Sequence, residues 1–252
     1  MIISHSRKFI FIHIHKTAGE SISEALQPYL SGRDLLLGTS PRGELNNAYY
    51  NFKYRLQKHS GARKVRTFVG DATWNDYLKF SFVRDPFDRL RSLYFYFERM
   101  LARRREPHLR NALLWLPGTG FRDPLKWPGM QAFLETENFS GFIRHPVFSA
   151  GIMGAQPQSL LLTDKEGNLD VDFVGKFETL AEDFATLAAR LGLEGADLGH
   201  RNASGNRAAT PDQAEAADRA LVAELYARDY ALFDYPLPVA AAPAAEAVAS
   251  AS

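Results

Sequence analysis

The hydrophobic pattern alternates between short, continuously apolar runs and longer stretches with helical spacing. Between Lys8 and Ile14 almost every residue is apolar, which predicts a central strand buried on both faces of a parallel sheet. A polar loop follows at 15–21. Beyond it the apolar positions recur at the spacing of a buried helical stripe, at Ile22, Ala25, Leu26 and Tyr29. The first segment is therefore predicted to form a strand, a short loop and a helix.

A second segment of the same kind begins with the apolar run Lys79–Val83. Asp85 is a favourable N-cap, and Pro86 suits the first helical position. Asp88 adds an acidic residue in the first turn, so a helix is predicted to start at Pro86. The apolar stripe of this helix leaves Asp85, Arg89 and Ser92 on a separate flank. We therefore expect Ser92 to face a ligand and not the core.

A third strand and two further helices follow later in the chain. Residues 171–174 have the composition of a strand, a helical stripe begins at Phe177, and a final helix is predicted across 210–226. Repeated alternation of strands and helices predicts an α/β domain with a mainly parallel central sheet and helices on both faces. Ligands bind such sheets at the carboxyl ends of strands, where Lys16 and Arg84 fall.

Two parts of the chain depart from this alternation. Between 99 and 158 the pattern blurs, and we interpret this part as a variable insertion. Its short candidate helices lie at 107–116, 130–137 and 138–144. Residues 239–252 are rich in alanine and have too little bulk to pack, so they are expected to form a disordered tail. The prediction is a single domain over 1–238.

Composition narrows the classes of function. Thirty Lys and Arg residues stand against twenty-nine Asp and Glu residues, so no global field attracts nucleic acid or anionic membranes. Cysteine is absent, which excludes disulfides, thiolate nucleophiles and Cys-ligated zinc. The apolar runs are far shorter than the ~20 residues of a membrane-spanning helix, and no signal peptide is recognisable. We expect no transmembrane segment.

The loop at 15–21 carries the residues of an anion site. Backbone N–H groups at a helix start are unpaired, and the helix dipole adds positive potential. Lys16 adds a full charge, Gly19 permits close backbone approach, and Thr17 and Ser21 offer hydroxyl donors. The lysine precedes the glycine, so this is not a Walker A loop. The alternative is an ordinary turn with one exposed lysine.

Arg84 and Ser92 form a second candidate anion site. An arginine can bind a phosphate with two parallel hydrogen bonds, whereas a lysine acts as a point charge. The alternative for Arg84 is a surface ion pair with Asp85 or Asp88. Two anion sites at neighbouring strand ends predict one ligand with two separated phosphates.

These segments together resemble the P-loop-like sulfotransferases that use 3′-phosphoadenosine 5′-phosphosulfate (PAPS), and more specifically their carbohydrate-type branch. Phe11–Ile22 is similar to the strand and 5′-phosphosulfate loop of that family, and Phe82–Tyr94 is similar to its 3′-phosphate segment. Val171–Phe184 resembles a later strand and helix of the family. The resemblance implies a P-loop-NTPase-like fold and leaves the middle of the chain unmatched.

The resemblance implies transfer of a sulfuryl group from PAPS to a hydroxyl of a carbohydrate or glycolipid acceptor by in-line attack, with no metal. It implies that the 5′-phosphosulfate is bound by Lys16, Thr17, Ala18, Gly19, Glu20 and Ser21. Arg84 and Ser92 would hold the 3′-phosphate. Charge grows on the bridging oxygen in the transition state, which makes Lys16 the catalytic cation.

His59 is the candidate general base. It lies where similar enzymes carry a basic residue, and an ordinary histidine pKa near 6.5 suits proton abstraction. The alternative is a loop histidine that caps a helix or faces solvent. Four weaker candidates for the base are His13, His15, His145 and Glu20.

Three residues of the first loop depart from the family pattern. His15 replaces the usual proline, Ala18 replaces a glycine, and Glu20 stands where threonine is common. Ala18 costs little if its φ is negative. Glu20 favours the helix dipole but repels a bound phosphate unless its side chain turns outward.

Two runs of basic residues interrupt the otherwise balanced charge. Residues 45–70 contain no acid and six cations, at Lys53, Arg55, Lys58, Arg63, Lys64 and Arg66. A second run comprises Arg99, Arg103, Arg104, Arg105 and Arg110. Such runs are more often solvated helix faces, and if functional they indicate an anionic glycan or lipid headgroup. The loop Arg201–Arg207 is expected to fold over the bound nucleotide.

Two other function classes stay open. A phosphotransferase that uses ATP predicts a Ser or Thr after Gly-Lys to hold Mg²⁺, and that motif is missing. A non-catalytic nucleotide-binding protein would keep Arg84 and Ser92 but would need no base at His59. Relatives in the Golgi carry a membrane anchor and cysteines, whereas here the first predicted strand begins by residue 8. We therefore expect a bacterial, cytoplasmic enzyme.

Overall fold

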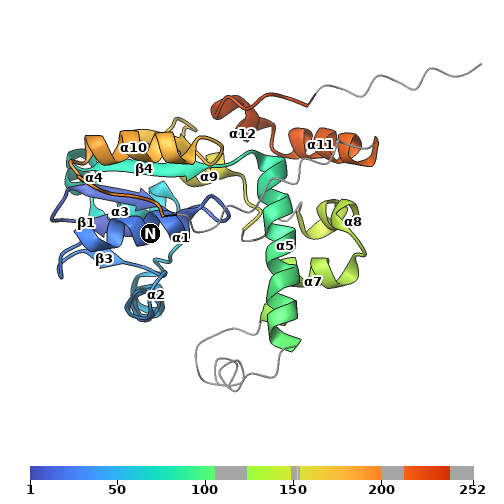
Figure 1. The fold of residues 1–252 in the computed structure, drawn as a ribbon, viewed down its shortest axis with the longest axis horizontal. Coiled ribbons are helices and arrows are strands. Elements are labelled where there is room, and N and C mark those ends of the chain that lie inside the picture. The colour runs from blue at the N-terminus through green and yellow to red at the C-terminus, as the bar shows by residue number, and fades with distance from the viewer. Residues whose placement is uncertain (106–123, 149–151, 153, 200–212, 239–252) are drawn as a thin grey trace, which may run out of the picture.

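The computed structural model describes residues 1–105, 124–148, 152, 154–199 and 213–238 (Figure 1). Within these residues, five strands form one sheet in the order β3-β1-β2-β4-β5. The strands are β1 (Ile2–Ser4), β2 (Phe9–Ile12), β3 (Leu35–Leu36), β4 (Leu78–Val83) and β5 (Phe173–Lys176). The apolar run before the first loop thus forms the central strand, as predicted. No helix among the described residues is long and apolar enough to cross a bilayer.

The sheet is mixed, so the expectation of a mainly parallel sheet was wrong. β2 pairs in parallel with β4, and β4 with β5. β1, however, runs antiparallel to both β2 and β3. Sequence analysis missed β1 and β3 because strands of three and two residues are too short to show a pattern. β1 also turns back directly into β2, through Lys8 with a φ of 53°.

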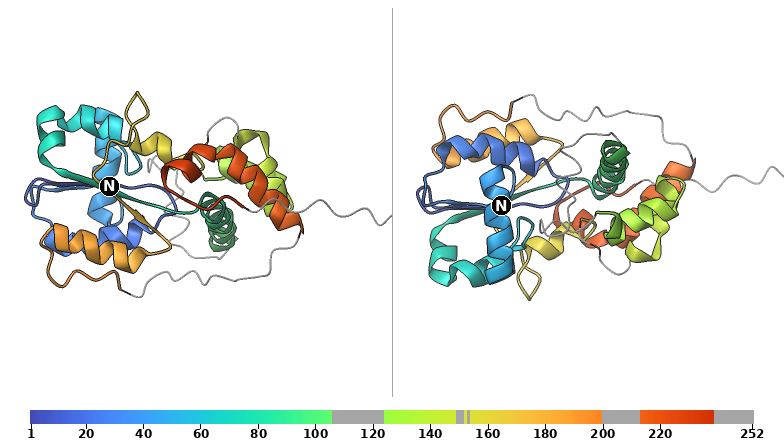
Figure 2. Two further views of the ribbon diagram at one scale, coloured as in Figure 1. Left: turned by 90° about the horizontal axis from the view of Figure 1, so that it is seen from above. Right: turned by 90° about the horizontal axis from the view of Figure 1, so that it is seen from below.

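Helices cover both faces of the sheet, as expected (Figure 2). The helices in the first half of the chain are α1 (Gly19–Leu26), α2 (Pro41–Tyr54), α3 (Ala62–Val69), α4 (Asp71–Asp76) and α5 (Pro86–Arg105), with the 3-10 turn η1 (Gln27–Tyr29). Those in the second half are η2 (Pro124–Lys126), α7 (Pro128–Glu135), α8 (Phe139–Arg144), η3 (Pro146–Phe148), α9 (Gln158–Leu162), α10 (Leu180–Arg190), α11 (Gln213–Leu225) and α12 (Ala227–Leu232).

Alternate residues of β2 belong to the two cores on either side of the sheet. Phe9 and Phe11 pack in the core formed with α1 and α10. Ile10 and Ile12 pack in the core on the opposite face, which includes residues of α3 and α4. All four side chains are at most 1% exposed. Burial on both faces explains why this strand is continuously apolar.

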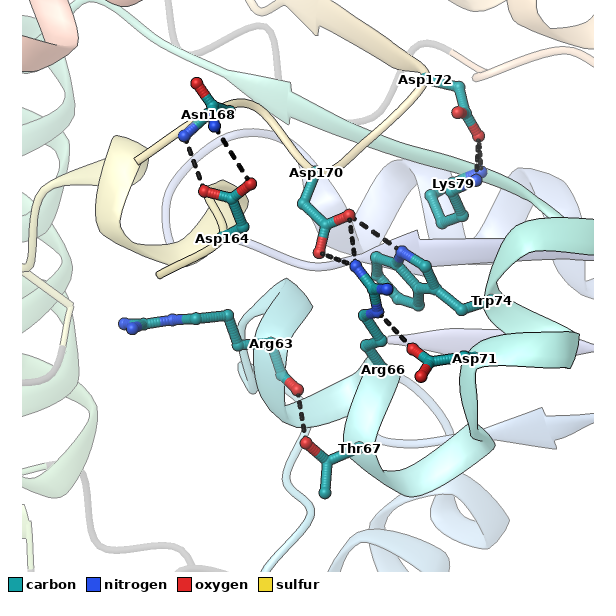
Figure 3. A network of polar contacts seen from close by, with 10 residues as sticks. All are labelled: Arg63, Arg66, Thr67, Asp71, Trp74, Lys79, Asp164, Asn168, Asp170 and Asp172. Carbon is teal, nitrogen blue, oxygen red and sulfur yellow. Dashed lines mark hydrogen bonds and ion pairs between the residues drawn. The ribbon is translucent and has the colours of Figure 1, made fainter. Parts of the chain in front are cut away.

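A polar network fastens α3 and α4 to the segment before β5 (Figure 3). The carboxylate of Asp170 accepts hydrogen bonds from the indole Nε1 of Trp74 at 3.0 Å and from Arg66 at 3.4 Å. Arg66 Nε also donates to Asp71 at 2.6 Å. Lys79 Nζ lies 2.8 Å from Asp172. One cation of the first basic run is therefore part of the scaffold.

Helix α5 leaves the sheet and carries α7, α8 and α11 on its sides (Figure 1). The helices expected at 130–137 and 138–144 correspond to α7 and α8. Four of the predicted segments lie outside the described residues: the helix at 107–116, the loop Arg201–Arg207, the start of the final helix and the tail at 239–252.

Near the carboxyl edge, one predicted element boundary is confirmed and two are shifted. Asp85 Oδ1 accepts a hydrogen bond from the backbone N–H of Asp88 at 2.9 Å, so the predicted N-cap of α5 is confirmed. α1 ends at Leu26 and not at Tyr29, because Pro28 allows only a 3-10 turn there. β5 lies two residues later than the predicted 171–174.

Candidate functional site

The two predicted anion-binding segments lie side by side. β2 and β4 are neighbouring parallel strands in which Ile12 is opposite Ser81, so the loops that follow them start at the same edge of the sheet. Ser81 Oγ donates to the carbonyl of Ile12 at 2.7 Å. The charge of Arg84 contributes to lowering the pKa of Lys16, which places the two cations within electrostatic range.

The loop after β2 has an unusual backbone. Lys16 and Ala18 have φ values of 67° and 62°, in the left-handed region. Ala18 was expected to cost little if its φ were negative, and its φ is positive. The residue therefore carries strain of roughly 1–2 kcal/mol that glycine would avoid. Thr17 Oγ1 donates to the carbonyl of Ile14 at 3.1 Å, so this hydroxyl closes the turn. Ile22 N–H donates to the carbonyl of Ala18 at 3.1 Å, at the start of α1.

Gly19 is required by its contact with His13. A Cβ at position 19 would lie 2.0 Å from His13 Nε2 and 2.1 Å from its Cδ2. The glycine was expected to let a phosphate approach the backbone; the structure adds a second reason, because the imidazole fills the space of a side chain. The first turn of α1 and the His13 ring therefore hold each other in place.

Glu20 pairs with Lys58. Their side chains form an ion pair in which the lysine side chain is 13% exposed and the carboxylate side chain is 55% exposed. The acidic departure from the family pattern is thus partly neutralised by a cation from the segment that carries His59. Lys58 belongs to the first basic run, and sequence analysis gave it no place in the site.

Lys16 lies among cations and an aromatic ring. Its Nζ is 4.4 Å from the centroid of the Tyr96 ring. Burial lowers the pKa of Lys16 from 10.5 to about 8, and the charges of Arg99 and Arg84 act in the same direction. The ammonium is still mostly protonated at neutral pH. A cation held close to other cations stabilises a bound anion strongly.

The Ser92 flank of α5 faces this loop. Ser92, Tyr96 and Arg99 are spaced four and three residues apart and therefore share one side of the helix. Tyr96 lies under the Lys16 ammonium, and Arg99 acts on its pKa. Ser92 is half-buried on this side. Sequence analysis missed Tyr96, although its spacing from Ser92 was the signal that could have identified it.

Arg84 is buried and lacks a full set of partners. The residue is only 9% exposed, and its guanidinium lies 4.1 Å from the centroid of the Phe177 ring. The Nε has no hydrogen-bond partner. Among the described residues Arg84 makes no ion pair with Asp85 or Asp88, because Asp85 caps α5 and Asp88 lies 3.7 Å from Arg91. The surface ion pair considered above is therefore not formed.

Gln158 holds the backbone of Arg84. Its side-chain Oε1 accepts from Arg84 N–H at 2.9 Å, and its Nε2 donates to the Arg84 carbonyl at 2.8 Å. Gln158 is held in turn by Asp229 of α12, which is fully buried and accepts from the backbone N–H groups of Gln158 at 2.7 Å and Ser159 at 2.8 Å. No sequence signal connects these residues, since they come from three distant segments.

Gln158→Leu is expected to lower the free energy of unfolding by about 2–4 kcal/mol, because it leaves a buried N–H and a buried carbonyl of Arg84 unsatisfied. Urea denaturation followed by circular dichroism measures the change. Ser159→Ala is the matched control, because it removes a buried hydroxyl that has no partner. Equal losses in the two variants would contradict the role assigned to Gln158.

Three histidines form a stacked cluster beside the loop. The His59 ring lies 3.4 Å from the His15 ring between centroids, nearly parallel at 27°. The edge of His13 meets His59 at 4.6 Å. His59 Nδ1 lies 2.9 Å from the carbonyl oxygen of His13. His145, by contrast, hydrogen bonds to Glu135 at 2.9 Å and is not part of the cluster.

The hydrogen bond to His13 sets the tautomer of His59. A carbonyl oxygen can only accept, so Nδ1 carries the hydrogen and Nε2 carries the lone pair. The ring lies in the cluster; it does not cap a helix. Burial lowers the pKa of His59 well below the usual 6.5, with His15 acting in the same direction, so the ring is neutral at physiological pH.

The cluster makes the protein sensitive to acid. Burial lowers the pKa of His13 well below 6.5 and that of His15 to about 3. These groups stay neutral in the folded chain but take up protons in the unfolded chain below pH 6.5, so stability is lost as the pH falls below that value. With His59, the loss approaches about 4 kcal/mol per pH unit below pH 6.

Chemical denaturation at pH 7.5, 6.5 and 5.5 tests this expectation. His15→Gln should remove one of the three histidine contributions to the slope. A wild-type stability that does not change over this range would show that the cluster accepts protons in the folded state.

The chain was compared with known proteins. A sequence model of the sulfotransferase family matches residues 1–236, which include both strand-end loops, His59, Gln158 and Asp229. No curated protein and no solved structure matches the chain. With the match extending over nearly the whole chain, the protein belongs to the sulfotransferase family.

Proposed function

We propose that this sulfotransferase moves a sulfuryl group from PAPS to a hydroxyl of a carbohydrate or glycolipid acceptor. The observation that carries the proposal is the pair of cations, half-buried Lys16 and buried Arg84, in adjacent loops at the ends of β2 and β4. Arg84 keeps an unpartnered Nε, and Lys16 makes no ion pair among the described residues. Both cations therefore favour an anionic ligand.

The donor would bind at both loops. The N–H groups at the start of α1 and the Lys16 ammonium bind the 5′-phosphosulfate, together with the loop residues through Ser21. Arg84 and Ser92 hold the 3′-phosphate, which distinguishes PAPS from ATP. The aromatic ring of Phe177 supports the guanidinium from one side and leaves its donors for the phosphate.

In the proposed reaction the acceptor oxygen attacks sulfur in line with the bridging oxygen. A new sulfur–oxygen bond forms, the bond to the 5′-phosphate breaks, and adenosine 3′,5′-bisphosphate leaves with the electron pair. His59 Nε2 takes the proton of the acceptor hydroxyl. Lys16 stabilises the charge that develops on the bridging oxygen. His59 and Lys16 come from different segments, and the Lys58–Glu20 ion pair links those segments.

The proposal also covers the domain organisation, the location of the protein and the charge of the acceptor. We infer one domain over 1–238, a cytoplasmic location in a bacterium, and an acceptor that carries negative charge. The exposed cations of the first basic run, such as Arg55, Arg63 and Lys64, support an anionic acceptor. No metal is required by the chemistry.

Incubation with ³⁵S-labelled PAPS and a panel of oligosaccharides and glycolipids tests the proposal. Label is expected in at least one acceptor, and calorimetry is expected to detect binding of adenosine 3′,5′-bisphosphate. Binding of the bisphosphate without transfer to any acceptor would favour a non-catalytic role. Hydrolysis of ATP with no bisphosphate binding would favour a phosphotransferase.

A further inference from the structure

Helix α2 carries an apolar stripe that points away from the protein. The stripe residues are Leu45, Tyr49 and Phe52, which are 74%, 52% and 83% exposed. They are spaced four and three residues apart, so they share one side of the helix. α2 packs beyond the edge strand β3, outside the layers that cover the sheet (Figure 1).

The opposite side of α2 is the side that packs on the protein. Gly43 is buried, and a Cβ there would lie 1.9 Å from the carbonyl oxygen of Gly38. Tyr50 meets Phe68 of α3 at 5.9 Å between ring centroids. The stripe is therefore not the packing face of the helix, and no fold-level reason accounts for its apolar residues.

Cations lie along one side of the stripe. On a helical projection Arg42 and Lys53 border it, and both are exposed. Lys53 Nζ donates to Tyr49 Oη at 3.2 Å and lies 5.1 Å from the Tyr54 ring. Tyr54 also contacts α3, which adds exposed Arg63 and Lys64. The only acid on α2 is Glu44.

We propose that α2 docks on a bilayer surface that contains anionic lipids. An amphipathic helix with aromatic and leucine residues on one side and cations beside them lies in the interface, where apolar side chains enter the headgroup region and cations meet phosphates. The aromatic rings and Lys53 suit this boundary because one end of each is apolar and the other is polar.

The charges favour a bilayer over a second copy of the chain. In a dimer whose stripes pack antiparallel about a two-fold axis, the flank that carries Arg42 and Lys53 would face the same flank of the copy, so like charges would meet. An anionic surface offers the complementary charge. The net charge of +1 gives no long-range attraction, so the local cluster has to supply it.

Cosedimentation of the full chain with vesicles tests the proposal. The experiment contains neither donor nor acceptor, so its result is independent of the proposed reaction. The chain is expected to bind phosphatidylcholine vesicles that contain phosphatidylglycerol. Binding should be weaker to vesicles of phosphatidylcholine alone, and binding to the anionic vesicles should weaken at high salt. The double variant Leu45→Ser, Phe52→Ser should lower the partition coefficient about tenfold or more. Lys53→Gln should weaken binding to the anionic vesicles only.

Leu134→Ser on α7 is the matched control, because Leu134 is also exposed, at 46%, but has no part in the stripe. It should bind vesicles as the wild type does. Unchanged binding of the double variant, or no wild-type binding to either vesicle, would overturn the proposal. Sedimentation velocity separates the alternative: a dimer that the double variant abolishes would show that a second copy covers the stripe.

Discussion

Lys16→Met is expected to lower kcat by about a hundredfold to a thousandfold, the cost of losing one preorganised group that stabilises developing charge. The effect on kcat should exceed the effect on KM for PAPS, because the charge on the bridging oxygen grows only as the bond to sulfur breaks. Methionine keeps an unbranched chain of similar size that can pack on the Tyr96 ring, but it loses the charge and the cation–π contact. Steady-state transfer of ³⁵S label measures both constants.

The pH dependence of the same reaction provides a second test of Lys16. Because its pKa in the free enzyme is lowered to about 8, the ammonium is lost as the pH rises through that value, and kcat/KM for PAPS should fall above it. In Lys16→Met this alkaline decline should disappear along with most of the rate. Lys165→Met is the control, since that side chain is 84% exposed. A kcat close to that of the wild type in Lys16→Met would remove the catalytic role.

His59→Asn is expected to lower kcat by about a hundredfold to ten-thousandfold, the usual contribution of a general base. The amide nitrogen of asparagine can replace Nδ1 as donor to the His13 carbonyl, whereas nothing replaces Nε2. Binding of adenosine 3′,5′-bisphosphate should change little, because His59 is not assigned to the donor. His145→Asn, which alters a histidine outside the cluster, should retain full activity.

The acid limb of the rate profile distinguishes catalysis by His59 from a packing role. An ordinary histidine would lose its lone pair below pH 6.5, but the pKa of His59 in the free enzyme lies well below that value, so kcat/KM should stay constant down to about pH 6. Assays have to stop short of the pH at which the fold is lost. A rate that halves near pH 6.5 would indicate that another histidine, with an ordinary pKa, is the base.

The sequence predicted those features that depend on neighbouring residues. The strand before Lys16 was recognisable because burial on both faces requires continuous apolarity. The start of α5 was recognisable because a cap and a proline act over one turn. Both loops at the carboxyl edge followed from these two elements and from the rule that parallel neighbours end at the same edge.

Features that depend on distant residues were not predictable in this way. β1 and β3 are defined by pairing and not by pattern, so the sheet was expected to be mainly parallel. The contact of Gln158 with Arg84 joins residues far apart in the chain. The positive φ of Ala18 is set by the loop as a whole, since alanine itself disfavours it.

The carboxylate of Asp229 makes the support of Arg84 one of the last parts of the fold to be synthesised. Arg84 lies in the first half of the chain, whereas Asp229 belongs to the last helix that the structure describes. A nascent chain that already contains all five strands still lacks the group that anchors Gln158. The ribosome must therefore have released α12 before the contacts that hold the backbone of Arg84 are complete, so a chain that still lacks α12 is expected to hold Arg84 less firmly.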